Sequence, residues 1–96
     1  MMLWAIYDIR DDKQRAKVAK LCKKFGLYRV QLSVFLGTIE PNEFDELYLA
    51  SRELVNEDTD SVYLFPMTKK SFKQVKTIGK AFDKAMVTDQ VKQFFI

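Results

Sequence analysis

Residues 2–9 read MLWAIYDI, a run of bulky apolar side chains that ends at Asp8 and the charge cluster after it. Because apolar residues occupy both alternating sets of positions, the run predicts a β-strand that is covered on both faces. A layer of helices would cover one face. A chain of 96 residues has room for one modest core, so a second copy of the chain is the expected cover for the other face. The run therefore predicts an α+β domain that forms a homodimer.

A helix is expected directly after this strand. Asp11 or Asp12 can cap its N-terminus, and Gly26 is suited to the position that follows its C-terminus. Two sets of residues recur at helical spacing between these ends and lie on opposite faces. The apolar set is Val18, Leu21, Cys22 and Phe25, and the basic set is Lys13, Lys17, Lys20 and Lys24.

The segment 28–39, YRVQLSVFLGTI, is the second stretch that favours β-structure. Its alternation fits either one long strand or two short strands with a bend near residues 31–33, and periodicity does not choose between them. Pro41 suits the first turn of a second helix, and the acids that follow it complement the helix dipole. Residues 56–60 are polar and are expected to form a turn.

Shorter elements are expected in the last third of the chain. Residues 61–65 predict a strand that Pro66 ends. Residues 68–74 fit one helical turn, and residues 75–78 fit a short strand before Gly79.

The expected order β-α-β-β-α-β is that of the ferredoxin-like fold, here with an additional C-terminal strand and tail. We expect a ferredoxin-like domain over residues 1–80 and a tail over residues 81–96. The tail ends in the apolar residues 94–96, and such an end usually docks on another surface. We therefore expect residues 91–96 to pack on the second subunit or on another protein.

The composition excludes several kinds of chemistry. The chain contains no histidine, which rules out Ser-His-Asp catalysis and histidine-based acid–base phosphodiesterases. The single cysteine, Cys22, rules out an intramolecular disulfide and a cysteine-rich zinc site, and we expect it to fill the core. Any cleavage must therefore rely on carboxylate, Tyr, Lys or Arg side chains, or on a metal held by oxygen ligands.

Charge is distributed unevenly along the chain. Residues 10–29 contain eight Lys or Arg and two Asp, a net charge of +6, whereas residues 40–60 contain eight acids and one Arg, a net charge of −7. Residues 69–92 contain seven Lys and two Asp, a net charge of +5. The first segment suits a polyanion and the second a basic protein. No apolar run has the length of a membrane span and no signal peptide is recognisable, so we expect a cytoplasmic protein without membrane contact.

Several motifs together resemble one family. They are Y-D-I at 7–9, D-D-x-x-R-x-K-V at 11–18, R-V-Q-x-S-V-F-x-G at 29–37, S-V-Y-L-F-P at 61–66 and V-x-x-I-G at 75–79. This set resembles the small ferredoxin-like CRISPR-associated adaptation protein, the endoribonuclease-family partner of the CRISPR integrase. The resemblance covers most of the chain, and its most specific part is the 29–37 motif after a strand that ends in Asp.

The resemblance implies a homodimer in which the two Asp8 carboxylates face each other across the two-fold axis and hold Mg²⁺. It also implies catalytic roles, which fall on Asp8, Tyr7, Arg15, Arg29 and Phe35. The residues expected to bind DNA or RNA are Arg10, Lys13, Arg15, Lys17 and Arg29. Lys17 stands where some relatives carry Arg, which keeps the charge and loses the bidentate fork. Ser33 lies within the S-V-F part of the motif.

Two hypotheses about function follow from the resemblance. In the first, the protein is a metal-dependent RNA or DNA endonuclease of CRISPR adaptation. In the second, it is a non-catalytic DNA-binding scaffold that bridges two integrase dimers. Both can hold for one protein. A small toxin-type ribonuclease of the same fold is the remaining alternative, and the 29–37 motif fits the adaptation protein better.

Overall fold

The computed structural model describes residues 1–87, and these residues contain one antiparallel sheet with the strand order β2-β3-β1-β4. The strands are β1 (Met2–Asp8), β2 (Tyr28–Gln31), β3 (Val34–Thr38) and β4 (Ser61–Met67). The helices are α1 (Asp12–Lys24), α2 (Pro41–Leu54), α3 (Lys69–Lys73) and α4 (Lys84–Val87). The first six elements have the order and sheet topology of the ferredoxin-like fold, so this prediction is confirmed.

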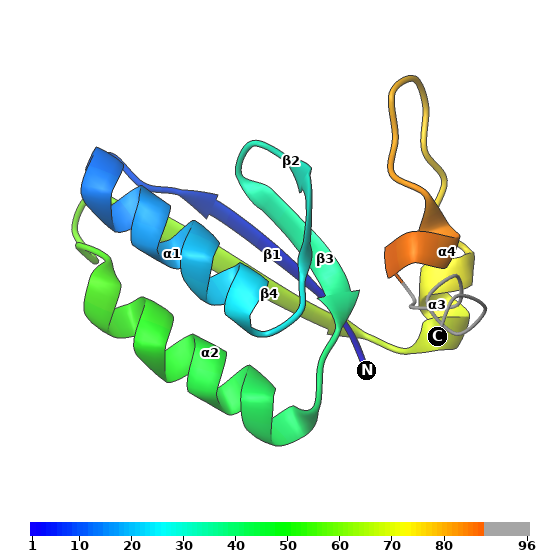
Figure 1. Cartoon of the computed structure of the whole chain (residues 1–96), viewed down its shortest axis with the longest axis horizontal. Coiled ribbons are helices and arrows are strands. Elements are labelled where there is room, and N and C mark those ends of the chain that lie inside the picture. Colours follow the sequence, from blue (N-terminus) through cyan, green and yellow to red (C-terminus); the bar gives the residue numbers. More distant parts are fainter. Residues whose placement is uncertain (88–96) are drawn as a thin grey trace.

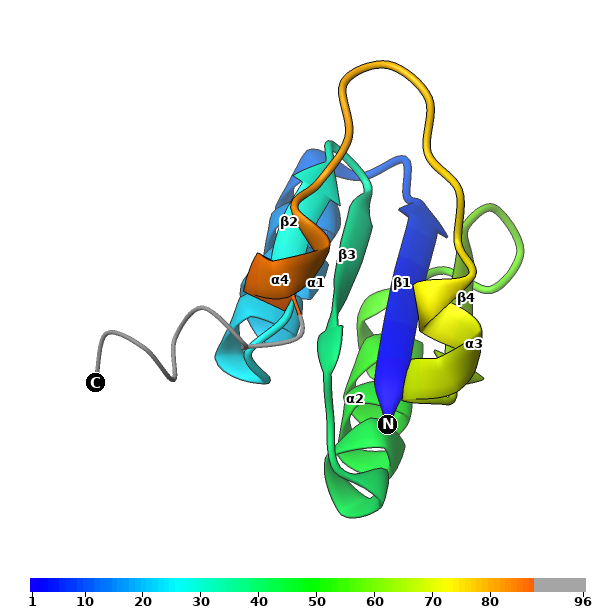
Figure 2. The same ribbon diagram turned by 90° about the vertical axis from the view of Figure 1, so that its right-hand side faces the viewer.

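The sheet has two unlike faces. Helices α1 and α2 lie side by side on one of them, which we call the helix face (Figure 1). The short helices α3 and α4 lie on the opposite side, which we call the open face (Figure 2). Leu3, Ala5 and Tyr7 of β1 pack with the helices, whereas Met2 and Trp4 pack on the other side. Alternation along β1 therefore places Ile6 and Asp8 on the open face.

Helix α1 has the ends that the sequence predicts. Asp11 is the residue that caps it, because its carboxylate accepts a hydrogen bond of 2.9 Å from the Gln14 N–H. Gly26 follows the helix with a φ of 82°, a conformation that favours glycine. Val18 and Cys22 of the predicted stripe are buried, and Leu21 and Phe25 pack against the same cluster at partial exposure.

The second β-prone segment forms two strands, so the alternative with a bend is the correct one. Strands β2 and β3 are joined by a turn at Leu32 and Ser33. The pairing shifts between Arg29 and Gln31, where β2 has an irregularity. Pro41 lies in the first turn of α2, as predicted, and the Glu40 N–H donates to the Glu43 carboxylate at 3.1 Å.

Two expectations for the last third of the chain are wrong. Pro66 does not end β4, which continues to Met67 with Pro66 opposite Leu3. Among residues 1–87, β4 pairs with β1 alone, and an edge strand tolerates proline because its free side needs no donor. Residues 75–78 form no strand: Val75 packs on the cluster of the open face, and neither edge of the described sheet pairs with this segment. They begin a connection that projects from the body between α3 and α4 (Figure 2), and Ile78 is fully exposed.

Two residues of the expected tail, Phe82 and Val87, pack on the open face. Val87 of α4 is buried with Met2, Leu36 and Phe72 against the open face. Trp4 contacts both Phe72 and Phe82, with ring centroids 6.3 Å and 5.6 Å away. The predicted docking segment at 91–96 lies outside the described residues. No helix within residues 1–87 has the length and apolar character needed to cross a membrane.

Candidate nucleic-acid interface and metal ligand

Asp8 is the last residue of β1 and its side chain is exposed. It pairs with Ser61, the first residue of β4, at the end of the sheet where the chain leaves for α1. Ile6, two residues earlier, lies opposite Val34 and Tyr63 on the same open face. The carboxylate therefore stands at the rim of an apolar surface rather than in a cleft.

Tyr7 faces the other way and is 3 % exposed. Its ring stacks on Phe35 with centroids 6.3 Å apart. Its hydroxyl donates a long hydrogen bond of 3.5 Å to the Leu32 carbonyl, and its N–H donates to the Ser33 carbonyl at 3.1 Å. Tyr7 therefore fixes the β2–β3 turn beside the end of β1, and within one subunit its ring does not reach solvent.

Phe35 is completely buried, and its ring contacts the side chain of Arg29. The guanidinium carbon of Arg29 lies 5.2 Å from the centroid of the Phe35 ring, within the range of a cation–π contact. Arg29 pairs with Phe35 across the β2–β3 ladder, so both lie on the helix face. Asp8 lies on the open face. The sheet therefore separates Arg29 from Asp8 within one subunit.

Arg15 is tied to the segment that follows Asp8. Its Nη1 donates to the Ile9 carbonyl at 3.1 Å, and its Nη2 forms an ion pair with Asp12. These contacts hold the β1–α1 connection against the first turn of α1. Of the predicted catalytic residues, Arg15 is thus the one whose bonds reach the residue next to Asp8.

The remaining predicted nucleic-acid ligands are exposed on or before α1. Arg10 lies in the β1–α1 connection, and Lys13 and Lys17 lie one turn apart on the helix. Lys20 and Lys24 continue the row, with the Lys24 ammonium 5.8 Å from the Phe25 ring. These exposed cations suit contacts to phosphate oxygens and carry no base-reading geometry.

The part of the chain that the structure describes holds no complete metal site. Among residues 1–87 no three Asp, Glu or Cys side chains gather closely enough to hold a metal. Asp8 nevertheless fits part of a magnesium site, because Mg²⁺ takes one or two carboxylates and keeps several waters. Where the ion takes two carboxylates, the Asp8 of another copy of the chain is the second ligand that the resemblance implies.

Cys22 takes no part in this chemistry. It lies on the buried face of α1, and burial raises the pKa of its thiol to about 12, with a smaller opposing effect from Arg29. A thiol with this pKa is protonated at neutral pH and is a poor nucleophile. Its predicted place in the core is confirmed.

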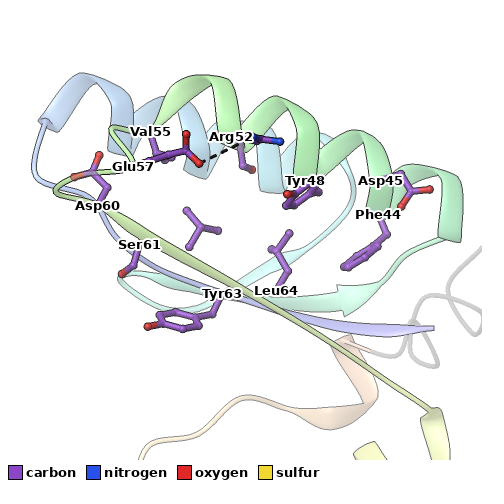
Figure 3. Close-up of a pocket in the computed structure, with 12 residues that line it drawn as sticks. Phe44, Asp45, Tyr48, Arg52, Val55, Glu57, Asp60, Ser61, Tyr63 and Leu64 are labelled. Carbon is purple, nitrogen blue, oxygen red and sulfur yellow. Dashed lines mark ion pairs between the residues drawn. The ribbon is translucent and has the colours of Figure 1, made fainter.

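Two hollows lie along β4 and the turn that precedes it. A groove of about 680 Å³ lies between α2 and the free edge of β4, and its lining includes Phe44, Tyr48 and Leu64 (Figure 3). A smaller polar hollow lies where Arg10 and Gln14 meet the turn before β4. None of the predicted catalytic residues lines either hollow.

Sequence reasoning missed two features around Asp8. Tyr63 and Phe65 are each about half exposed on the open face, with stacked rings 6.0 Å apart. Their alternation in the 61–65 run was the available signal. Asp60, in the polar turn, binds the backbone of Arg10, and a polar turn at 56–60 was predicted without this long-range bond.

Comparisons with known proteins find relatives of this chain. The family described as CRISPR associated protein Cas2 matches residues 1–75. The chain is 40% identical over 70 residues to "CRISPR-associated endoribonuclease Cas2 1" of Archaeoglobus fulgidus. The matched region covers 73% of this chain and 74% of the relative. It is 36% identical over 78 residues to "CRISPR-associated endonuclease Cas2 2" of Thermus thermophilus, with 80% of this chain and 81% of the relative covered.

Solved structures share the fold. The crystal structure of Streptococcus pyogenes Cas2 at pH 6.5 matches with a TM-score of 0.71 and 33% identity, over 82% of this chain and 100% of that one. A hypothetical protein from Thermus thermophilus matches with a TM-score of 0.72 and 32% identity, over 83% of this chain and 92% of that one. The chain belongs to the CRISPR associated protein Cas2 family.

Proposed function

We propose that this protein is a nucleic-acid-binding subunit of CRISPR adaptation that forms a homodimer and cleaves RNA or DNA at a magnesium site built from two Asp8 carboxylates. The placement of Asp8 carries the proposal, because it presents an exposed carboxylate at a strand end on the open face. The printed names of the relatives, endoribonuclease and endonuclease, support the reaction class.

The open face supports the homodimer. Tyr63 is 56% exposed and Phe65 is 49% exposed, and Ile6 and Val34 beside them are half-buried. A contiguous exposed apolar surface of this kind is typical of an interface. A two-fold contact uses the same patch twice, so it would bring the Asp8 residues of both subunits to one interface.

The chain's own residues would then have separate tasks. The paired Asp8 carboxylates would hold the ion, and Arg15 would keep the adjacent backbone in place through the Ile9 carbonyl. Magnesium held there supplies an activated water and neutralises charge on the phosphate. Arg10, Lys13 and Lys17 would hold the nucleic-acid backbone without reading its sequence.

The test compares purified wild type with Asp8→Asn on labelled RNA and on duplex DNA, with magnesium and with a chelator. We expect cleavage by the wild type that needs the metal, and none by Asp8→Asn. Asp45→Asn, which removes an exposed carboxylate from α2, should cleave like the wild type. Equal activity of wild type and Asp8→Asn would remove the nuclease part of the proposal.

A non-catalytic scaffold that bridges two integrase dimers is the second candidate. The separation of Arg29 from Asp8 by the sheet favours it, because a catalytic cluster would normally bring its cation and carboxylate together. In this case Asp8→Asn should assemble with the integrase as the wild type does. Deletion of residues 91–96 should weaken that assembly, and both results can be read by gel filtration of the mixture.

A further inference from the structure

The turn before β4 is bonded to the segment after β1 by one side chain. Asp60 Oδ1 accepts a hydrogen bond of 3.1 Å from the Arg10 N–H, across fifty positions of sequence. Its Oδ2 accepts a bond of 3.0 Å from the Asn56 N–H. The Thr59 hydroxyl donates a third bond of 3.2 Å to Oδ1. One carboxylate thus joins the β1–α1 connection to the α2–β4 turn.

Hydrogen bonds within the turn fix the position of this carboxylate. The N–H groups of Thr59 and Asp60 donate to the Asn56 carbonyl at 3.1 Å and 2.8 Å. The Asp58 N–H donates to the Asn56 side-chain oxygen at 3.0 Å. Figure 3 shows Asp60 at the start of β4, next to Ser61 and close to the end of α2. The position of Asp60 is therefore set by the turn and not by Arg10.

The bond acts on the immediate surroundings of Asp8. Ser61 follows Asp60 and pairs with Asp8, and Arg10 lies two residues beyond Asp8. Asp8 therefore lies between two fixed points. Ser61 pairs with it across the ladder, and the hydrogen-bonded backbone of Arg10 follows it in the chain. Because Ile9 is the only residue between them, the direction in which the Asp8 side chain leaves β1 depends on where Arg10 is held.

A full carboxylate is needed for this arrangement. Backbone hydrogen bonds from Asn56 and then from Arg10 lower the pKa of Asp60. An amide in its place has a single acceptor oxygen, and its NH₂ group would face one of the two N–H donors. Asn at this position therefore keeps either the bond to the turn or the bond to Arg10, but not both.

We propose that Asp60 is a positioning residue for Asp8, which it orients by holding the Arg10 backbone against the α2–β4 turn. This inference rests on the proposed nuclease function for its catalytic consequence. A displacement of about 1 Å in a catalytic group lowers rates by up to a hundredfold. Asp60 touches neither substrate nor metal in this account and acts through Asp8 alone.

The experiment measures kcat and KM for RNA cleavage with magnesium, at a temperature where every variant is folded by circular dichroism. Asp60→Asn should lower kcat about tenfold or more and change KM less than about twofold. The orientation of Asp8 affects the reaction step, whereas binding of the nucleic-acid backbone depends on other residues. Asp58→Asn is the matched control, since it removes the same charge from the same turn and should keep the wild-type kcat. Asn56→Ala removes the side-chain bond to the Asp58 N–H but keeps the backbone groups of residue 56 that hold Asp60, so it should lower the melting temperature and leave kcat near the wild-type value.

A second readout does not need catalysis. By NMR, Asp60→Asn should speed amide hydrogen exchange at Arg10 and shift the Asp8 carboxyl resonance, whereas Asp58→Asn should do neither. If the wild type cleaves nothing, the proposed function fails and this readout alone decides whether Asp60 orients Asp8. An unchanged Asp8 resonance and unchanged Arg10 exchange in Asp60→Asn would overturn the inference, and so would an equal loss of kcat in Asp58→Asn.

Discussion

Arg29 and Phe35 connect the core of the molecule to its charged surface. Phe35 is fully buried, and the centroid of its ring lies 5.2 Å from the guanidinium carbon of Arg29 on the edge strand β2. The ring restricts an otherwise mobile guanidinium, so a core residue determines where a surface cation lies. If Arg29 binds nucleic acid as we propose, the buried Phe35 of the 29–37 motif acts on that binding through Arg29.

We predict that Phe35→Leu lowers stability by about 1 to 2 kcal/mol, because it keeps most of the buried volume and loses the ring. Affinity for duplex DNA should fall as well, since Arg29 loses its support. Val18→Ala, another buried substitution, should lower stability without this effect on affinity. Urea unfolding and fluorescence anisotropy give the two quantities, and unchanged DNA affinity in Phe35→Leu would show that the ring does not position Arg29.

Cys22 gives a prediction about pH. Burial raises the pKa of its thiol from 9.0 to about 12, so the unfolded chain loses this proton at lower pH than the folded chain. The resulting stabilisation is complete below pH 9 and is lost as pH rises from 9 towards 12. The melting temperature of the wild type should therefore fall more steeply between pH 8 and 10.5 than that of Cys22→Ala. Parallel curves for the two proteins would contradict the raised pKa.

At the scale of elements, exposed cations on α1 and β2 are the groups that we propose contact nucleic acid. Replacing Arg15, Lys17 and Arg29 together by Ala should weaken binding to all sequences alike. Each lost phosphate contact reduces the slope of log affinity against log salt by about 0.9 on duplex DNA, so the slope should fall by about 2 to 3. The same number of charges removed from Lys69, Lys70 and Lys73 is the control and should change the slope less. A strong preference for one base sequence would replace this account with direct base readout.

The elements also show what sequence can and cannot predict. Strand β1, helix α1 and the start of α2 were predictable because caps, glycine and apolar spacing are local signals. Whether residues 75–78 pair depends on where the chain runs after α3 relative to the sheet edges, which no local pattern reports. The same limit applies to the site. Asp8 was recognisable at its strand end, but the placement of Arg29 on the opposite face depends on the β2–β3 register and the irregularity after Arg29.

For the whole molecule, the open face is the surface on which we expect two copies of the chain to meet. Its Tyr63–Phe65 pair is stacked and about half exposed, and a dimer would bury it. We predict that Phe65→Glu converts the dimer to a monomer of 11.3 kDa, because a buried carboxylate without a partner is costly. Leu49→Glu is the matched control, since Leu49 is 58% exposed on α2 and away from the open face. Light scattering after gel filtration measures both, and a wild-type monomer would refute the dimer.

The central claim is that one active site needs Asp8 from both subunits, and mixing subunits tests it directly. Wild type and Asp8→Asn are combined in varying ratios, unfolded and refolded together, and assayed for magnesium-dependent RNA cleavage at constant total protein. If both carboxylates are required, activity follows the square of the wild-type fraction, so an equal mixture retains about a quarter of the activity. A linear decline, with about half the activity in the equal mixture, would mean that each subunit cleaves alone and would contradict the shared site.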